Sequence, residues 1–461
     1  QQFVIQVGIL VIFFLIPLWL RLPNAPKSFT RGYVLGFAWL IPLAFTLAIW
    51  GMSGFMGFRK IVKKGRQTFF AFAILGLALW SACSVLWAYM RDTRPDMTWG
   101  VVGQVALMAL FAVMVLSIAP HPRWIALALI LGMLAQGFIG AWQVTIQDDI
   151  GLRFLGEFRL DPAKGGISVV QAGDVRWLRP YGLTPHPNPY AGYVMVGVLC
   201  VLGWVMAWAM KSTPIQTIKL GRRGLPWQAS TMPTIHPIGR RDMIHHVRMG
   251  LWGGLLLVIL LFGFYILLLT FSRGAWLGFA IAGAGMLFIL TARRMWSWRS
   301  FRIGLAVLGM LIITSGIFLL LYHPFILARA GVSDEYVERR AVNERAIHLT
   351  IAYAAFEDAP VWGVGIGNFP WYATYYLRYE MRVDMKGDNI HNVYLSALAE
   401  LGIIGLVLML GGLGTALTVF PKDLYRLGLW GGVMALAVVG LFDHYTWSML
   451  TYSALWWGLM G

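Results

Sequence analysis

Apolar runs long enough to cross a lipid bilayer recur along the whole chain, and they limit its fold more than any other feature. Examples are VGILVIFFLIPLWL at 7–20 and GLWGGLLLVILLFGFYILLLTF at 250–271. A membrane-spanning helix needs about 20 mainly apolar residues, and in lipid every backbone polar group must find its partner within the protein. The sequence therefore predicts an all-α, polytopic integral membrane protein with a single transmembrane domain at 1–461.

The composition is incompatible with a large soluble domain. Of the 461 residues, 59% are hydrophobic and only 12% are charged, which excludes an ordinary soluble protein. We expect about twelve membrane-spanning helices, the first of them retained rather than cleaved as a signal peptide. The predicted spans lie near 3–20, 32–55, 69–90, 98–119, 123–144, 189–210, 250–271, 274–291, 303–322, 391–419, 427–441 and 444–460.

Lysine and arginine residues are concentrated in three loops, at 56–68, 211–249 and 292–302. Loops rich in Lys and Arg stay on the cytoplasmic side of a membrane, so we assign all three to the cytoplasm. Counting spans from them places both termini in the cytoplasm and places the longer segments 145–188 and 323–390 in the periplasm. We expect the second of these to be a large, partly helical loop that carries part of the active site.

The net charge of +17 mainly reflects this topology, although basic loops also attract anionic lipids. The chain has no folded basic module of the kind that binds nucleic acid, so we expect membrane lipids and no nucleic acid among its partners. Cys83 and Cys200 both fall inside predicted spans. Neither a disulfide nor a cysteine metal site is therefore expected.

The first polar cluster on the outer side is RPYGLTPHPN, from Arg179 to Asn188, directly before a predicted span. Its prolines predict a stiff, extended segment. Arg179, His186 and Asn188 are candidates for a functional site, because polar residues near a membrane cost free energy and are retained for a reason. The competing interpretation is a rigid loop whose Arg and His face lipid headgroups.

The second cluster, Ser272-Arg273-Gly274, lies between two spans with almost no loop. Arginine offers a planar set of donors that matches phosphate and stays charged at any working pH. A helix beginning near 275 would add the positive potential of its free amides. We therefore consider an anion site here, against the alternative that Arg273 only extends its side chain to the interface.

The third cluster lies within 323–390, where an amphipathic stretch brings Arg345 and Leu349 one helical turn apart. The following Gly363–Asn368 segment superficially resembles a dinucleotide-binding motif, but it follows no strand and lies on the wrong side of the membrane. A glycine turn that folds the loop back on the helices is the better interpretation.

The loop ends at His391 and Asn392, before a long apolar run. We expect Asp388 or Asn389 to cap that helix, which puts His391 in its first turn. The positive end of a helix favours neutral imidazole, and a neutral imidazole accepts a proton. A histidine that only forms hydrogen bonds at the interface is the alternative.

Taken together, these motifs resemble the O-antigen ligase and polymerase superfamily of bacterial envelope glycosyltransferases, and most closely its lipopolysaccharide O-antigen ligases. Arg345–Leu349 matches the family pattern Arg-x3-Leu. The pattern His-Asn-x9-Gly-x-x-Gly is matched by His391, Asn392, Gly402 and Gly405. Further similar elements are Ser272–Gly274, His186–Asn188 and Ser84–Trp87.

The resemblance implies a GT-C-like membrane glycosyltransferase of the bacterial inner membrane whose active site faces the periplasm. Such an enzyme transfers a preassembled glycan from undecaprenyl diphosphate to a hydroxyl of the lipid A core, without a nucleotide sugar, a cofactor or a catalytic metal, and inverts the anomeric centre. His391 would be the general base. The diphosphate would be bound by Arg273 and Arg345, with a weaker contribution from Arg179. Supporting roles fall to Asn392, His186, Asn188 and Ser272.

Two kinds of alternative remain. An O-antigen polymerase or a protein O-oligosaccharyltransferase would share the same layout with a different acceptor. A transporter of lipid-linked glycan would also suit many spans, but the sequence has no internal repeat and its polar clusters gather at one face. A metal site on the outer side remains a further alternative, and its candidate ligands are Asp148, Asp149, Glu157 and Asp161.

Overall fold

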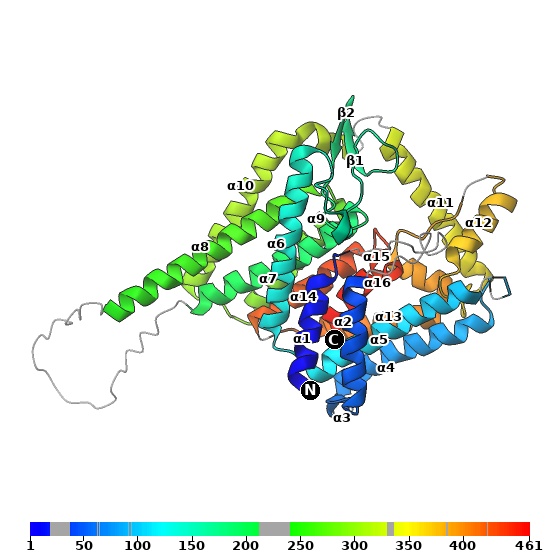
Figure 1. Cartoon of the computed structure of the whole chain (residues 1–461), viewed down its shortest axis with the longest axis horizontal. Helices are drawn as coiled ribbons and strands as arrows, with labels where there is room; N and C mark the ends of the chain where they lie inside the picture. Colours follow the sequence, from blue (N-terminus) through cyan, green and yellow to red (C-terminus); the bar gives the residue numbers. More distant parts are fainter. Residues whose placement is uncertain are drawn as a thin grey trace, which may run out of the picture.

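The computed structural model describes residues 1–18, 37–61, 63, 65–90, 92–93, 95–211, 240–329, 336–383, 386–421 and 423–461. These residues are mostly helical (Figure 1), which confirms the prediction of an all-α polytopic membrane protein. Eight of the described helices are long and apolar enough to cross a membrane: α4 (Gly65–Cys83), α5 (Pro95–Ile118), α6 (Pro122–Ile146), α7 (Pro187–Lys211), α8 (Arg240–Leu269), α9 (Arg273–Ala292), α10 (Trp298–Arg329) and α13 (Val393–Thr418).

Shorter apolar helices overlap three further predicted spans, namely α1 (Gln2–Leu15), α2 (Phe37–Met52) and α14 (Leu424–Val439). The spans predicted at 3–20 and 32–55 extend in part beyond the described residues. The same holds for the predicted basic loop at 211–249, of which 212–239 lie outside the described part of the chain. Short helical turns are α3 (Phe58–Ile61), η1 (Ser84–Leu86) and η2 (Arg153–Leu155).

The last predicted span, 444–460, is divided into two helices, α15 (Tyr445–Ser448) and α16 (Leu450–Met460). Met449 between them has an extended backbone, with φ −107° and ψ 110°. An uninterrupted span was therefore the wrong prediction here. The break makes α15 a single turn of helix that directly follows an ionisable pair, Asp443 and His444.

Helix α14 packs between α7 and α9, and α13 packs against α4. The contact between α7 and α14 is close because Gly203 and Gly428 face the partner backbone. A Cβ on Gly203 would lie 2.7 Å from the carbonyl oxygen of Leu424. Small residues permit such close approach between membrane helices.

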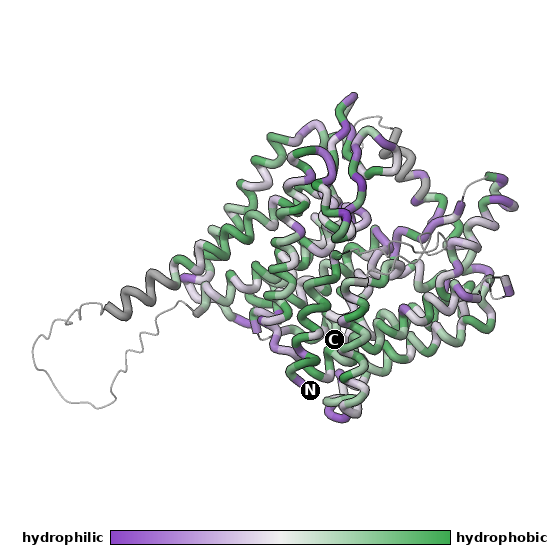
Figure 2. Tube along the Cα trace, in the orientation of Figure 1, coloured by the Kyte–Doolittle hydropathy of each residue, from purple (hydrophilic) through white to green (hydrophobic). Residues whose placement is uncertain are grey.

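Hydrophilic residues gather at two opposite rims of the molecule, while the middle of the helices is hydrophobic (Figure 2). One rim carries the short helix α3, and the other carries a hairpin formed by β1 (Val169–Ala172) and β2 (Val175–Leu178) (Figure 1). The hairpin is antiparallel, with Val170 paired to Trp177. The segment 145–188 was predicted only as a loop. The hairpin was missed because each of its strands has only four residues.

Glu157 organises the segment that precedes the hairpin. Its carboxylate accepts hydrogen bonds from the backbone amides of Ile150 and Leu152, at 2.9 and 2.6 Å, and from Gln143 Nε2 at 2.8 Å. Nearby, Asp161 Oδ2 forms a salt bridge with Lys164 Nζ at 3.0 Å, and Asp149 Oδ2 forms one with Arg153 Nη2 at 3.6 Å. These carboxylates therefore all bind neighbouring groups of the same segment.

The segment predicted as a large outer loop, 323–390, begins inside α10, which continues to Arg329. Its main elements are α11 (Tyr336–Asp358) and α12 (Phe369–Tyr379). Helix α12 packs on α11 and α13, and the buried side chains that join them form a small apolar core: Ile351, Ala355, Phe369, Tyr372, Leu377 and Ile390. The loop is thus folded and partly helical.

The glycine segment after α11 docks on a break in α13. Gly402 has φ 66° and ψ −168°, so α13 is interrupted there and the carbonyls before the break are released. The amides of Val364 and Gly365 donate to the Ala399 and Glu400 carbonyls, both at 2.9 Å, and Ile403 N donates to Pro360 O at 3.0 Å. The interpretation as a glycine turn that folds back on the helices is confirmed.

Ser84 and Trp87, which belong to the Ser84–Trp87 element noted in the sequence, form hydrogen bonds to the glycine segment around Gly363–Asn368. Ser84 Oγ accepts from the amide of Ile366 at 3.1 Å, and Trp87 Nε1 donates to Trp362 O at 3.2 Å. The turn after α4, the glycine segment and α13 therefore form one connected unit.

Gly402→Ala is expected to destabilise the protein by roughly 1–3 kcal/mol, since its backbone conformation is essentially restricted to glycine. A Cβ there would also lie 2.1 Å from Val361 O, which would force the docked segment away. Thermal unfolding in detergent measures the change. Gly414→Ala, in the same helix with open space around its Cβ position, is the control and should not lower the transition temperature. Equal transitions for both variants would contradict the proposed docking.

Candidate active site

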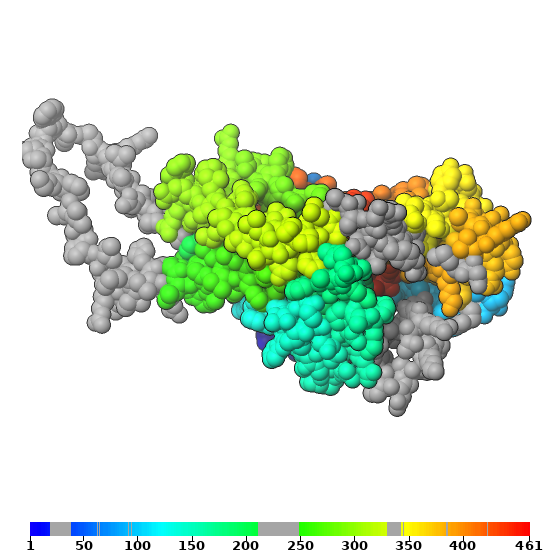
Figure 3. Space-filling model, turned by 90° about the horizontal axis from the view of Figure 1, so that it is seen from above, coloured from blue at the N-terminus to red at the C-terminus, as the bar shows by residue number. Residues whose placement is uncertain are grey.

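A cavity of about 300 Å³ opens where the starts of α7 and α9 meet the ends of α10 and α14. It contains three arginines and one aspartate, so it is suited to a polar, anionic ligand. In the view from above, C-terminal atoms (red) lie between the segment 145–188 (teal) and the α11–α12 region (yellow and orange) (Figure 3). The residues that line the cavity are Asn188, Ser272, Arg273, Gly274, Leu277, Arg329, Arg345, Val439, Phe442 and Asp443.

Arg273 and Arg329 are held at one edge of the cavity by reciprocal contacts. Arg273 begins α9 and donates from Nη1 to the carbonyl oxygen of Arg329 at 2.5 Å, while Arg329 Nη2 donates to Phe271 O at 3.3 Å. Phe271 adopts a left-handed conformation (φ 49°), which makes the tight turn between α8 and α9. The free amides at the start of α9 add positive potential at this edge.

Arg345 reaches the cavity from α11, on another wall. Its positive charge helps to lower the pKa of His391, so Arg345 lies within electrostatic reach of that imidazole. Leu349, the other member of the Arg-x3-Leu motif, is 48% exposed and does not line the cavity. The structure thus brings Arg273, Arg345, Asn188 and Ser272 together, as the sequence predicted for a common site.

Arg179 is placed behind the cavity instead of on its wall. Its side chain is buried, and it donates to Thr270 O at 2.6 Å, to Ser168 Oγ at 2.8 Å and to Asn188 Oδ1 at 2.7 Å. These contacts connect the start of α7 to the end of α8. In this arrangement Arg179 orients Asn188, which does line the cavity.

Asn188 in turn orients Asp443. The side-chain Nδ2 of Asn188 donates to Asp443 Oδ2 at 2.7 Å, and the backbone amide of Asn188 donates to His186 Nδ1 at 3.2 Å. Burial and the charge of Arg179 lower the pKa of His186 to about 3, so its imidazole is neutral and able to accept. Burial opposes ionisation of Asp443, but the neighbouring imidazoles and the bond from Asn188 hold its pKa below the usual range.

The helix that follows His391 is capped differently from the prediction. Asn392 is the N-cap of α13, and its Oδ1 accepts from the amides of Tyr394 and Leu395 at 3.0 and 2.9 Å. The predicted caps, Asp388 and Asn389, were wrong because the loop reaches further along the chain before the helix begins. His391 therefore lies just before α13 and not in its first turn.

Asn392 also fixes His391 beside the segment that follows α14. Its Nδ2 donates to Leu441 O at 3.1 Å, and the next amide, Val393 N, donates to Gly440 O at 2.7 Å. Two segments far apart in the sequence are joined in this way. The supporting role predicted for Asn392 has a structural basis in these bonds.

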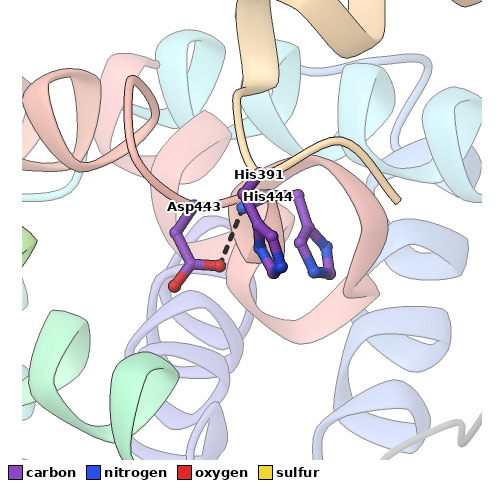
Figure 4. A group of neighbouring side chains, drawn as sticks. All are labelled: His391, Asp443 and His444. Atoms are coloured by element: carbon purple, nitrogen blue, oxygen red, sulfur yellow. Dashed lines mark hydrogen bonds between the residues drawn. The ribbon is translucent and has the colours of Figure 1, made fainter. Parts of the chain in front are cut away.

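His391, Asp443 and His444 form a compact cluster (Figure 4). The two imidazole rings have centroids 5.0 Å apart, and each residue offers a nitrogen or oxygen within 4.8 Å of those of the other two. His444 Nδ1 lies 2.6 Å from Ser448 Oγ, and the His444 amide donates to Asp443 Oδ1 at 2.8 Å. His391 does not line the cavity itself, but its neighbour Asp443 does.

Burial, followed by the charge of His444, lowers the pKa of His391 to about 4. Its imidazole is therefore neutral near pH 7, as predicted, but the cause is burial and not a helix N-terminus. The Nδ1 atom is buried and has no hydrogen-bond partner among the described residues. A neutral ring with an available lone pair is suited to accept a proton.

Sequence reasoning did not identify Arg329, Asp443 or His444. Arg329 was assigned to a loop, although it ends a helix. The Asp443-His444 pair interrupts the apolar C-terminal run, and ionisable residues in such a position mark functional candidates. That signal was present in the sequence but was read as the boundary between two spans.

A family model described as O-antigen ligase matches residues 255–410. The matched segment contains Arg273, Arg345 and His391, whereas Asp443 lies beyond it. No curated protein matches the chain. The members of this family are membrane glycosyltransferase-like enzymes. The chain is thus a multi-pass membrane protein that is similar to the O-antigen ligase family over residues 255–410.

Proposed function

We propose that the protein is an O-antigen ligase that transfers a preassembled glycan from undecaprenyl diphosphate to a hydroxyl of the lipid A core. The observation that carries the proposal is the arginine-lined cavity with a neutral histidine next to it. We place the site on the periplasmic face of a bacterial inner membrane, with both termini in the cytoplasm. The basic loops near α3 and after α9 support this orientation.

The diphosphate of the donor would occupy the cavity. Arg273, Arg345 and Arg329 supply guanidinium groups from three different helices, and guanidinium groups form charge-assisted hydrogen bonds to phosphate oxygens. As the bond from the sugar to the diphosphate breaks, negative charge grows on the leaving oxygen. Positive groups fixed in advance stabilise that charge.

His391 would remove the proton of the acceptor hydroxyl. The hydroxyl oxygen attacks the anomeric carbon, the C–O bond to the diphosphate breaks, and undecaprenyl diphosphate leaves with its electron pair. The proton passes to His391, and the carboxylate of Asp443 then stabilises the imidazolium. One displacement without a covalent intermediate inverts the anomeric centre.

The acceptor distinguishes the ligase from its alternatives. Purified protein is given carrier-linked glycan together with lipid A core, a second carrier-linked glycan or a Ser/Thr-containing acceptor protein, without ATP. We expect product with lipid A core. Elongation of the second carrier-linked glycan would identify a polymerase, and glycosylated protein would identify a protein O-oligosaccharyltransferase. Binding without any product would favour a transporter.

The pH dependence of transfer should reflect the lowered pKa of His391. The neutral form acts as base, so kcat/KM should stay level from about pH 8 to about pH 5 and fall as the pH drops through about 4, where free His391 takes up a proton. Bound diphosphate adds negative charge nearby and should move the acidic limb of kcat to higher pH. Rate profiles at low and saturating donor measure both limbs. A kcat/KM limb near the ordinary histidine pKa of about 6.5 would contradict the buried position of the base.

A further inference from the structure

We propose that the cluster of His391, Asp443 and His444 binds a divalent transition-metal ion, best fitted by Zn²⁺, and that this ion blocks glycan transfer. Metal binding itself depends only on the geometry of the cluster. The inhibitory effect rests on the proposed function, since it requires His391 to act as the base.

The three side chains converge from two segments of the chain. One ligand atom from each lies within 4.8 Å of those of the other two, and all three residues are partly buried. Zinc bonds of about 2.0–2.2 Å hold tetrahedral ligands roughly 3.3 Å apart, so the widest pair would close by about 1.5 Å. Side-chain rotation supplies movement of this size without a change in the backbone.

The remaining hydrogen bonds leave ligand atoms available. His444 Nδ1 contacts Ser448 Oγ, which leaves Nε2 for the metal. On His391 the buried Nδ1 makes no hydrogen bond within the described chain, and such an atom gains most from a new partner. Asp443 Oδ2 accepts from Asn188 and Oδ1 accepts from the amide of His444, and each carboxylate oxygen keeps a second lone pair for a metal.

These same bonds form a second layer of support around the cluster. Metal-binding imidazoles usually bond through their other nitrogen, and metal-binding carboxylates are themselves hydrogen-bonded. Ser448 forms such a bond with His444, and Asn188 forms one with Asp443. Asn188 is itself held by Arg179, whose Nη2 donates to Asn188 Oδ1 at 2.7 Å. A tetrahedral ion held by these three side chains keeps its fourth position for water.

The donor set selects the metal. Two imidazoles and one carboxylate suit zinc and related transition metals, whereas Mg²⁺ and Ca²⁺ prefer oxygen ligands. An ion bound here would occupy the nitrogen lone pair of His391 that takes the acceptor proton. Zn²⁺ should therefore inhibit transfer, Mg²⁺ should not, and EDTA should restore activity and leave metal-free enzyme unaffected.

Zinc titration calorimetry on purified, EDTA-treated and dialysed protein tests the binding site. We expect one Zn²⁺ per chain. Ser448→Ala should weaken binding roughly 10- to 100-fold, the usual effect of losing a bond that orients a ligand, and His444→Gln at least as much. His323→Gln is the matched control, because His323 is exposed on α10 and is not part of the cluster. Zinc binding that is absent, or equal in all variants, would overturn the proposed site.

Transfer rates with and without Zn²⁺, compared as a ratio within each variant, test the effect on function. The rate with Zn²⁺ divided by the rate without it should be well below one for wild type and His323→Gln, and closer to one for Ser448→Ala. Normal transfer without zinc binding would refute this inference and leave the proposed function intact. Zinc binding in a protein without any transfer activity would refute the function and leave the site intact. Stimulation by Zn²⁺ would show that the ion does not block the base.

Discussion

His391→Ala is expected to lower the rate of glycan transfer roughly 10²- to 10⁴-fold, the usual contribution of a general base, while donor binding survives. The structure supports this separation, because His391 stands next to the cavity and the arginines line it. Carrier-glycan affinity and single-turnover transfer measure the two effects independently.

The matched control is His323→Ala, an exposed histidine of α10 outside the cluster, which should keep the wild-type rate. Near-normal turnover of His391→Ala would refute the role of His391 as base. If that variant instead loses donor binding as completely as the arginine variants, His391 belongs to the anion site.

Arg273→Ala and Arg345→Ala should each weaken binding of the carrier-linked glycan roughly 10- to 150-fold, which corresponds to the 1.5–3 kcal/mol of a hydrogen bond to a charged group. Turnover should fall as well, because the same contacts stabilise the leaving diphosphate. Arg273→Lys keeps the charge but loses the planar arrangement of donors, so it should remain well below wild type.

Arg159→Ala is the control for this pair, since Arg159 is exposed on the outer segment and does not line the cavity. Arg273 also bonds the carbonyl of Arg329, so the thermal stability of each variant must be compared with wild type. Unchanged affinity in a stable Arg273→Ala protein would mean that this side chain only extends to the interface.

The helical fold was largely predictable because membrane spans depend on local composition. Long apolar runs such as 250–271 predict helices without knowledge of their neighbours. Interruptions were less visible. The break at Gly402 depends on hydrogen bonds to the folded-back segment that contains Pro360 and Val364. The break at Met449 divides a run, 445–457, that contains neither proline nor glycine.

The candidate site was predictable where a residue type alone indicates its chemistry. Arg273, Arg345 and His391 stood out because charged or titratable groups are rare and costly near lipid. The partners of His391 did not, because Asp443 and His444 reach it only through packing of α13 against the segment after α14. Arg179 has the chemistry of an anion ligand, but its burial and bonds to Thr270 and Asn188 depend on the tertiary structure.

The central claim is that the arginine-lined cavity holds the carrier diphosphate, and site-specific photo-cross-linking tests it most directly. Leu277 lines the cavity, whereas Leu287 on the same helix does not, and their exposed fractions are similar, 43% and 45%. A benzoylphenylalanine placed at 277 should cross-link to carrier-linked glycan, and excess undecaprenyl diphosphate should compete with it. The same group at 287 should give little cross-linking and no competition. Equal cross-linking at both positions, or cross-linking at 277 that undecaprenyl diphosphate does not reduce, would contradict the account.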